Sequence, residues 1–322
     1  MESKARNMRE VLGALPPADP EKAAALLARE RAGVCRKMVV LDDDPTGVQT
    51  VHDISVYTGW TPELVRQGFD EEESLFFILT NSRSFTAEQT REAHREMAEA
   101  IGKVSRETGK PFVLVSRSDS TLRGHYPLET ETLRQVLETD FGLRYDGEIL
   151  CPFFLEGGRY TVGNIHYVQE GEMLIPAGET EFAKDATFGY RSSDLARWCE
   201  EKTGGRYPAD QVVSIPLEEL RALDVEGIAA KLSGVKDFGK VIVNAADPAD
   251  IQVFLAAFFR VLKAGKEFLF RGAAAIPKAL GGVADRPLLT HGELVDDREA
   301  NGGIVLVGSH VKKTTRQLEA LK

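Results

Sequence analysis

The chain has 322 residues, of which 43% are hydrophobic and 28% charged, with 40 basic and 50 acidic side chains. This balance is typical of globular proteins and argues against global disorder. The net charge of −10 argues against non-specific nucleic-acid binding, which depends on excess positive charge. The length predicts two domains, or one large domain with a fragment of another.

Neither membrane insertion nor a disulfide framework is expected. The longest strongly apolar run, 253–259, is far shorter than the ~20 residues of a membrane span, and the first residues lack the apolar stretch of a secretory signal. Cys35, Cys151 and Cys199 are odd in number and widely spaced, without the spacing of a zinc site. We therefore expect a cytoplasmic protein without a bound structural metal, and leave the existence of a homo-oligomer open.

The pattern of apolar residues predicts an α/β fold. Residues 1–32 show helical spacing, interrupted by Pro16 and Pro17. Short apolar runs then predict strands over 37–41, 54–57, 75–79, 111–115, 148–151, 240–243 and 304–307. Periodic stretches between them predict helices over 87–104, 127–137, 193–202 and 217–232. The alternation of strands with helices indicates a largely parallel sheet flanked by helices.

A glycine-rich stretch around Gly281 and Gly282, ending near Pro287, is the best candidate for a domain boundary. We expect an N-terminal helical segment over 1–36, a ligand-binding α/β domain over 37–284, and the start of a second α/β domain over 285–322. The last segment holds only about forty residues, a length at which a chain rarely builds a core of its own.

Three loops that follow predicted strands carry candidate functional residues, since ligands of open α/β sheets bind outside the carboxyl ends of the strands. The first loop, 42–47, begins with three consecutive aspartates and contains the candidate binding residues Asp43, Asp44, Thr46 and Gly47. Adjacent carboxylates repel one another, so a polyhydroxylated ligand, a cation or a role as general base would explain them. The alternative is an acidic turn punctuated by proline and glycine.

The second loop, 116–125, leads into the helix predicted from Pro127. Its candidate binding residues are Arg117, Asp119, Ser120, Thr121, Arg123 and Gly124. The arginines suit bidentate binding of a carboxylate or phosphate, the hydroxyls can donate hydrogen bonds, and a helix N-terminus favours anions. The alternative is that Ser and Asp cap the helix while both arginines face water.

In the third loop, 152–161, Gly157 and Gly158 precede Arg159. Two glycines allow the backbone to approach a ligand closely, so Gly158 and Arg159 are candidate binding residues. A tight hairpin with an exposed arginine would give the same pattern, and the sequence does not separate these two interpretations.

Taken together, the three loops resemble the four-carbon acid sugar kinase family. The matching motifs are Leu-Asp-Asp-Asp-Pro-Thr-Gly from residue 41, Asp-Ser-Thr-Leu-Arg-Gly from residue 119, Gly-Gly-Arg from residue 157, and Gly-Ser-His-Val from residue 308. Members phosphorylate threonate, erythronate or 3-oxo-tetronate with ATP, using an N-terminal domain for the sugar acid and a C-terminal domain for the nucleotide. Pro45 and the Arg271-Gly272 pair depart from the usual pattern.

The resemblance implies that 37–284 binds the sugar acid and that 285–322 begins the nucleotide domain, with Ser309 contacting ATP. Mg²⁺ would arrive with the nucleotide. Asp119 is the expected general base, with Asp43 as the second choice, and Arg123 with Arg117 would hold the carboxylate of the substrate. A binding-only module for a small hydroxy acid is the alternative from another functional class, and a purely structural α/β domain is a third. Sugar acid and ATP are the partners expected.

Overall fold

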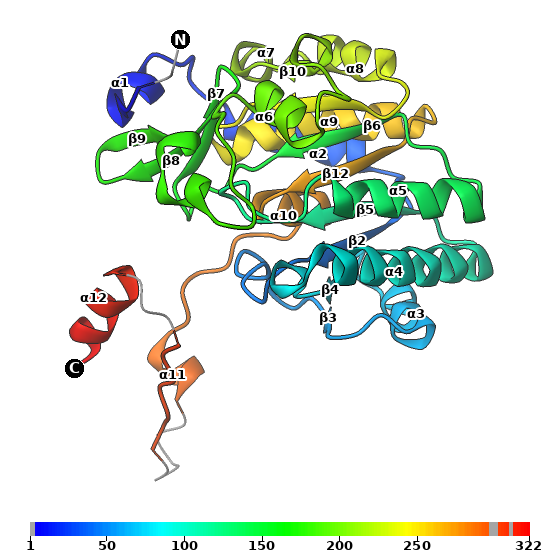
Figure 1. The fold of residues 1–322 in the computed structure, drawn as a ribbon, viewed down its shortest axis with the longest axis horizontal. Coiled ribbons are helices and arrows are strands. Elements are labelled where there is room, and N and C mark those ends of the chain that lie inside the picture. The colour runs from blue at the N-terminus through cyan, green and yellow to red at the C-terminus, as the bar shows by residue number, and fades with distance from the viewer. Residues whose placement is uncertain (1–3, 296–301, 309–311) are drawn as a thin grey trace. The chain divides into compact units, whose positions relative to one another are not determined.

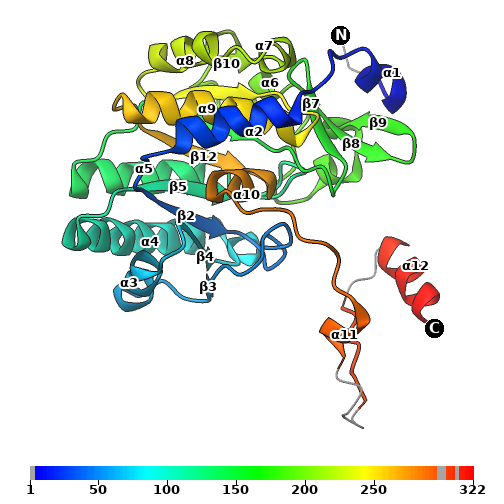
Figure 2. The same ribbon diagram turned by 180° about the vertical axis from the view of Figure 1, so that it is seen from behind.

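The computed structural model describes residues 4–295, 302–308 and 312–322. The chain forms two compact units that meet in sequence between Ala284 and Asp285. The first unit consists of a central parallel sheet with a layer of helices on each face and a small antiparallel sheet beside it (Figures 1 and 2).

The central sheet has eight strands in the order β10-β11-β6-β12-β5-β2-β4-β3, and every neighbouring pair is parallel. The strands are β2 (Lys37–Asp42), β3 (Val56–Tyr57), β4 (Leu75–Leu79), β5 (Phe112–Arg117), β6 (Gly147–Cys151), β10 (Val213–Ile215), β11 (Gly239–Val243) and β12 (Phe268–Gly272). Every residue of β2, β5, β6 and β12 is buried. These strands read as continuous apolar runs because helices cover both faces of the sheet.

Helices on the two faces close two separate cores. On the face seen in Figure 1 lie α3 (Pro62–Asp70), α4 (Ala87–Thr108), α5 (Leu128–Phe141) and α6 (Leu195–Lys202). On the face seen in Figure 2 lie α2 (Pro20–Arg31), α7 (Leu217–Arg221), α8 (Val225–Gly234), α9 (Pro248–Lys263) and α10 (Ala275–Gly281). Alternate strand residues divide between the cores: Val40 packs under α9 and α2, whereas Val39 packs under α4.

A small antiparallel sheet lies at the carboxyl edge of the central one. Its order is β1-β9-β8-β7, with β1 (Arg6–Asn7), β7 (Arg159–Val162), β8 (Ile165–Glu170) and β9 (Met173–Pro176). Thr161 of β7 exchanges two backbone hydrogen bonds, of 2.9 and 3.0 Å, with Ala245, just after β11. The short helices α1 (Met8–Gly13), η1 (Ser82–Ser84), η2 (Ala177–Glu179), η3 (Glu181–Lys184) and η4 (Ala209–Gln211) complete this unit.

The α/β fold with a parallel sheet flanked by helices is confirmed, but some predicted elements are wrong. The helix predicted over 217–232 is two helices, α7 and α8, because Leu223 adopts a φ of +57° between them. The antiparallel sheet was not predicted, and neither were helix α9 and strand β12, which lies in the middle of the central sheet. The apolar run at 253–259 belongs to α9, whose N-terminus is set by a capping box between Asp247 and Asp250.

The second unit contains α11 (His291–Leu294) and α12 (Lys312–Leu321). The strand predicted over 304–307 is wrong: these residues belong to no strand, and Ile304 and Leu306 are 95% and 94% exposed. A parallel strand forms only beside a neighbouring strand, and the described residues of this unit supply none. Across the described chain, no helix is long and apolar enough to cross a membrane.

Candidate functional site

The first two candidate loops follow adjacent strands. β2 pairs with β5 on one side and with β4 on the other, so the strand order reverses between β2 and β5. Such a reversal opens a crevice at the carboxyl edge of a parallel sheet, which is where ligands of open α/β folds bind. Asp42 ends β2 and Arg117 ends β5, in register as partners. The topology therefore places both loops at the reversal.

Two arginines neutralise the three consecutive aspartates. Arg83 binds Asp43 through two nitrogens, Nη2 to Oδ1 at 2.6 Å and Nε to Oδ2 at 3.1 Å, and its Nη1 lies 2.5 Å from Asp44 Oδ2. Arg117 Nη1 lies 2.9, 3.4 and 3.5 Å from carboxylate oxygens of Asp42, Asp43 and Asp44. We call these five residues the acidic cluster. The two guanidinium groups offset the mutual repulsion of the three carboxylates.

Burial divides the carboxyl groups of the acidic cluster into two kinds. Burial raises the pKa of Asp42 to about 7, against the opposing effect of Arg117, and raises the pKa of Asp43 to about 6, against the effect of Arg83. The side chain of Asp44 is 19% exposed, and although burial would raise its pKa, Arg83 and Thr46 together lower it. Asp44 is therefore ionised at neutral pH, while the two deeper carboxyls titrate closer to neutrality.

The second loop carries a fourth carboxylate, Asp119, toward this cluster. Arg123 Nε donates to Asp119 Oδ2 at 2.6 Å, the hydroxyl of Thr121 donates to the same oxygen, and Arg83 Nη1 lies 4.0 Å from Oδ1. Burial would raise the pKa of Asp119, but Arg83 and Arg123 outweigh it and lower the pKa to about 2. Arg83 thus joins the first two candidate loops into one network.

The small antiparallel sheet fixes the backbone of the second loop. Burial lowers the pKa of His166 on β8 to about 4, so its imidazole is neutral. Its Nε2 donates to the carbonyl of Ser120 at 2.7 Å, because a carbonyl only accepts, and its Nδ1 accepts from the hydroxyl of Thr161 at 2.9 Å. The hydroxyl of Tyr190 donates to the carbonyl of Thr121 at 2.7 Å. The loop is therefore held by β8 and by the segment between η3 and α6.

The third loop forms a hairpin whose arginine faces the second loop. Phe154 and Arg159 exchange backbone hydrogen bonds of 3.1 and 2.8 Å across the turn, and Gly158 adopts a φ of +69° there. The guanidinium carbon of Arg159 lies 5.6 Å from the ring centre of Phe182, and that of Arg123 lies 5.0 Å from the same ring. The half-buried Arg159 therefore approaches the second loop instead of extending into water.

Gly124 lies where side chains of three other elements or loops converge on the second loop. Its φ is +125°, and an added Cβ would lie 3.3 Å from Arg271 Nη2, 3.6 Å from Asp43 Oδ2 and 3.8 Å from Glu129 Oε2. Arg271 Nη2 also donates to the carbonyl of Arg123 at 3.3 Å. Only glycine suits this backbone conformation and leaves room for the side chains that converge on it.

One protein family matches most of the chain. A family described as the sugar-binding N-terminal domain matches residues 38–280, which include all three loops and both strands at the reversal. The chain belongs to this family. No curated protein matches the sequence of this sugar-binding domain.

Solved structures share the fold of the sugar-binding domain. A Haemophilus influenzae protein is 14% identical with a TM-score of 0.52, covering 76% of this chain and 55% of that one. A domain of unknown function from Bordetella bronchiseptica, a domain-swapped dimer with bound citrate, is 20% identical with a TM-score of 0.54 and the same coverage. At these identities the likeness concerns the fold alone. The chain spans about half the length of the solved chains that it matches.

The structure brings most of the predicted site residues together. Asp43, Asp44, Arg117, Asp119, Ser120, Thr121, Arg123, Gly124, Gly158 and Arg159 lie on the three loops around the reversal. Thr46 is exposed, with its hydroxyl bonded to Asp44, while Gly47 packs against the carboxylate of Asp42. Ser309, expected to contact ATP, lies outside the described residues.

Several residues of the site were not predicted. They are Arg83, Glu129, His166, Phe182, Asp185 and Tyr190. Arg83 follows β4 within a few residues, so its loop lies where ligands of such folds bind, but no neighbouring acid or arginine singles it out in the sequence. The others lie on elements that the sequence pattern did not associate with this edge of the sheet.

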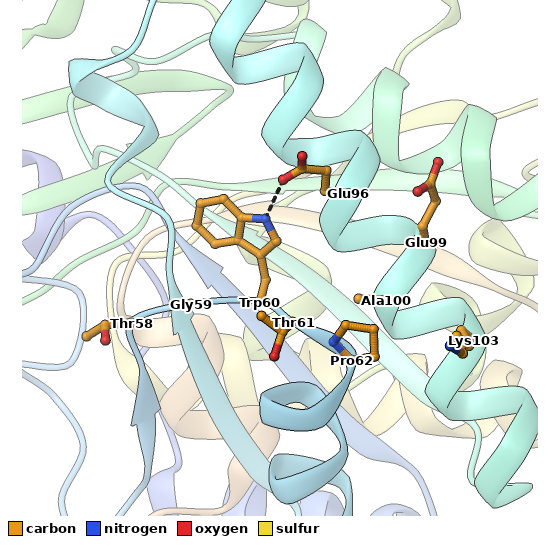
Figure 3. A pocket seen from close by; sticks show the side chains of 9 residues that line it. All are labelled: Thr58, Gly59, Trp60, Thr61, Pro62, Glu96, Glu99, Ala100 and Lys103. Atoms are coloured by element: carbon orange, nitrogen blue, oxygen red, sulfur yellow. Dashed lines mark hydrogen bonds between the residues drawn. The ribbon is translucent and has the colours of Figure 1, made fainter.

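A groove of about 570 Å³ lies elsewhere, at the β3 edge of the sheet between the segment entering α3 and the middle of α4 (Figure 3). Trp60 Nε1 donates to Glu96 Oε2 at 2.8 Å on its wall. No candidate residue of the three loops lines this groove. The accessible part of the candidate site includes the side chains of Asp44, Arg83 and Arg123, which are 19%, 20% and 27% exposed.

Proposed function

We propose that this sugar-binding domain binds a four-carbon sugar acid at the carboxyl edge between β2 and β5, as the acceptor-binding part of an ATP-dependent sugar-acid kinase. The observation that carries the proposal is Arg83, which joins Asp43 and Asp44 of one loop to Asp119 of the next. The family match supports the sugar, and the resemblance of the three loops supports the acid and the kinase. The citrate bound by the Bordetella bronchiseptica protein is itself a hydroxy acid.

The charges at the site suit the two chemical groups of a sugar acid. Ionised carboxylates accept hydrogen bonds from hydroxyls, and Asp44 and Asp119 are both held ionised by neighbouring arginines. Arg123 is partly exposed and presents donors to the carboxylate of the ligand. Arg117, expected to help it, is only 4% exposed and is engaged by the acidic cluster, so we assign it to neutralising the aspartates.

Of the two expected general bases, we assign the role to Asp43. A base works best when its pKa lies near the working pH, and the pKa of Asp43 is about 6 whereas that of Asp119 is about 2. Asp43 would take the proton of the attacking hydroxyl as its oxygen bonds to phosphorus. Arg83, which contacts both carboxylates, would keep the base oriented.

ATP would supply the phosphoryl group, with Mg²⁺ carried on its phosphates. The described residues contain no group of three or more metal-ligating side chains that could hold the ion by themselves. The described part of 285–322 forms two short helices and no strand.

Calorimetry with threonate and erythronate tests the binding step, and transfer of labelled phosphate from ATP tests the kinase step on the same protein. We expect saturable binding of at least one acid, and its loss in Arg83→Met. Where the chain transfers phosphate, Asp43→Asn abolishes turnover while acid binding persists, and Asp119→Asn weakens binding. Acid binding without transfer indicates the binding-only module, and no binding of any four-carbon acid contradicts the proposal.

A further inference from the structure

Arginines crowd the carboxyl edge, but they differ in what neutralises them. Arg83 and Arg117 contact the aspartates of the acidic cluster, and Arg123 contacts Asp119. Among the described residues, Arg159 forms no ion pair with a carboxylate within 4.0 Å, and its Nη1 donates to the backbone carbonyl of Gly157. Arg159 is thus a half-buried cation whose nearest partner is neutral.

The environment of Arg159 makes this lack of an anion costly. Its Nε is inaccessible to water and has no hydrogen-bond partner, so that donor is left unsatisfied. Burial lowers the pKa of Arg159, and neighbouring Arg123 acts in the same direction against the opposing effect of Asp119. A desolvated guanidinium beside a second one is stabilised by an anion that both can reach.

Phe182 contacts both guanidiniums. Their central carbons lie 5.0 Å (Arg123) and 5.6 Å (Arg159) from the centre of its ring, within the range of a cation–π contact. Asp185, three residues beyond Phe182, lies 4.0 Å from Arg123 Nη1 and borders the pair on the Arg123 side. Arg271 also lacks a carboxylate partner among the described residues, but it is 4% exposed and lies against the rings of Tyr126 and Trp198.

We infer that Arg159, together with Arg123 across Phe182, forms the subsite for the carboxylate of the ligand and makes the domain select a sugar acid over the corresponding uncharged polyol. This inference rests on the proposed function, because it assigns one end of the same ligand. A monoanion matches Arg159, the half-buried guanidinium at this edge that has no carboxylate partner among the described residues, and a planar carboxylate suits the fork of guanidinium donors. The hydroxyls of the ligand then extend toward Asp119 and Asp44.

The inference is tested by the affinity of the full chain for four probes: erythronate, the uncharged four-carbon polyol erythritol, citrate and inorganic phosphate. In the wild type, erythronate binds at least tenfold more tightly than erythritol. Arg159→Gln removes this preference, so the two affinities become similar while the erythritol affinity stays unchanged. Arg159→Lys, which keeps the charge but not the fork, retains part of the preference. Arg197→Gln, an exposed arginine on α6, is the control and changes neither.

The outcomes separate the subsite from the proposed function. If Arg159→Gln binds erythronate as the folded wild type does, the subsite is overturned while the proposed function stands. If the wild type binds citrate through Arg159 but binds no four-carbon acid, the subsite is supported and the proposed function fails. If Arg159→Gln weakens only the binding of inorganic phosphate, the arginine serves a phosphoryl group and the inference is overturned. If the wild type binds neither acid, both are overturned.

Discussion

Two groups of buried charged residues on the same sheet differ in how their charges are balanced and in how close they lie to solvent. Lys240 on β11 and Glu148 on β6 are register partners, both fully buried, with Nζ 2.5 Å from Oε2. The ring centres of Phe238 and Tyr207 lie 3.8 and 4.0 Å from Nζ of Lys240. Here one cation meets one anion inside an aromatic enclosure. The acidic cluster instead gathers three carboxylates on two arginines, at an edge that solvent reaches.

The difference shows how a structural ion pair is told from a site. A matched, enclosed pair has no charge left for a ligand, and buried pairs of this kind often contribute little net stability compared with apolar residues. The acidic cluster keeps two carboxyls, Asp42 and Asp43, at raised pKa values, and holds Asp44 and Arg83 partly exposed. Groups of carboxyls with shifted pKa values occur preferentially at functional sites.

The largest expected effect comes from breaking the enclosed pair. Lys240→Met leaves the Glu148 carboxylate buried without its cation, and Glu148 Oε1 already has no partner, so we expect the free energy of unfolding to fall by about 3–5 kcal/mol. Adding Glu148→Met should recover most of this loss. Urea unfolding measures both variants, and sugar-acid affinity of the double variant should equal that of the wild type. A single variant as stable as the wild type would show that the pair is not desolvated as described.

A smaller effect is expected at Gly47, where the first loop packs against the carboxylate of Asp42. A Cβ added to Gly47 would overlap the carboxylate of Asp42, which Arg117 holds in place. Gly47→Ala should therefore cost about 1–3 kcal/mol, as overpacking of a tight interior does. Gly234→Ala at the end of α8 is the matched control, since nothing lies within 4 Å of its added Cβ. Equal urea midpoints for the two variants would contradict this packing.

Removing Arg83 should affect the ligand more than the fold. Arg117 still contacts all three aspartates in Arg83→Met, but the connection between the first loop and Asp119 is lost. We expect the affinity for the sugar acid to fall at least tenfold, which is about 1.4 kcal/mol, as measured by calorimetry. Arg66→Met, which removes an exposed ion pair with Glu107, is the control and should leave affinity unchanged. Unchanged affinity in Arg83→Met would separate the acidic cluster from binding.

Arg83, which the sequence analysis did not identify, shows which part of the site the sequence could predict. Strands buried on both faces are recognisable as apolar runs, and the loops after β2 and β5 were identified because acids and arginines gather there. Arg83 has no such company in sequence and becomes a site residue only because β4 lies beside β2. Local spacing does not encode which strands become neighbours, so partners supplied from a different loop stay hidden.

The same reasoning applies to the supports of the second loop. His166 and Tyr190 act on Ser120 and Thr121 from elements 46 and 69 residues further along the chain. His166 reaches the loop through the antiparallel sheet, whose short strands carry too few residues for a clear alternation pattern, and Tyr190 reaches it from a segment without regular secondary structure. The chemistry of the site was therefore predictable in part, whereas the scaffold that orients it was not.

The acidic cluster is also expected to make the stability of the domain depend on pH. The pKa values of Asp42 and Asp43, about 7 and about 6, lie above their ordinary value of 3.8, so the folded state retains protons that the unfolded chain has released. Their contribution to stability is complete below pH 3.8 and is lost as the pH rises through 6 and 7. Asp119 acts in the opposite sense, because its contribution is lost as the pH falls from 3.8 toward 2.

Between about pH 4 and pH 7, the free energy of unfolding should therefore decrease with pH by at most about 1.4 kcal/mol per unit for each of the two carboxyls. Asp42→Asn removes one titrating group, so the difference between wild type and variant should change steadily across this range, as urea unfolding at each pH measures. The exposed Asp210→Asn is the control and should give a constant difference. A constant difference for Asp42→Asn as well would mean that the deep carboxyl of the cluster is already ionised, like the carboxylate of an ordinary matched pair.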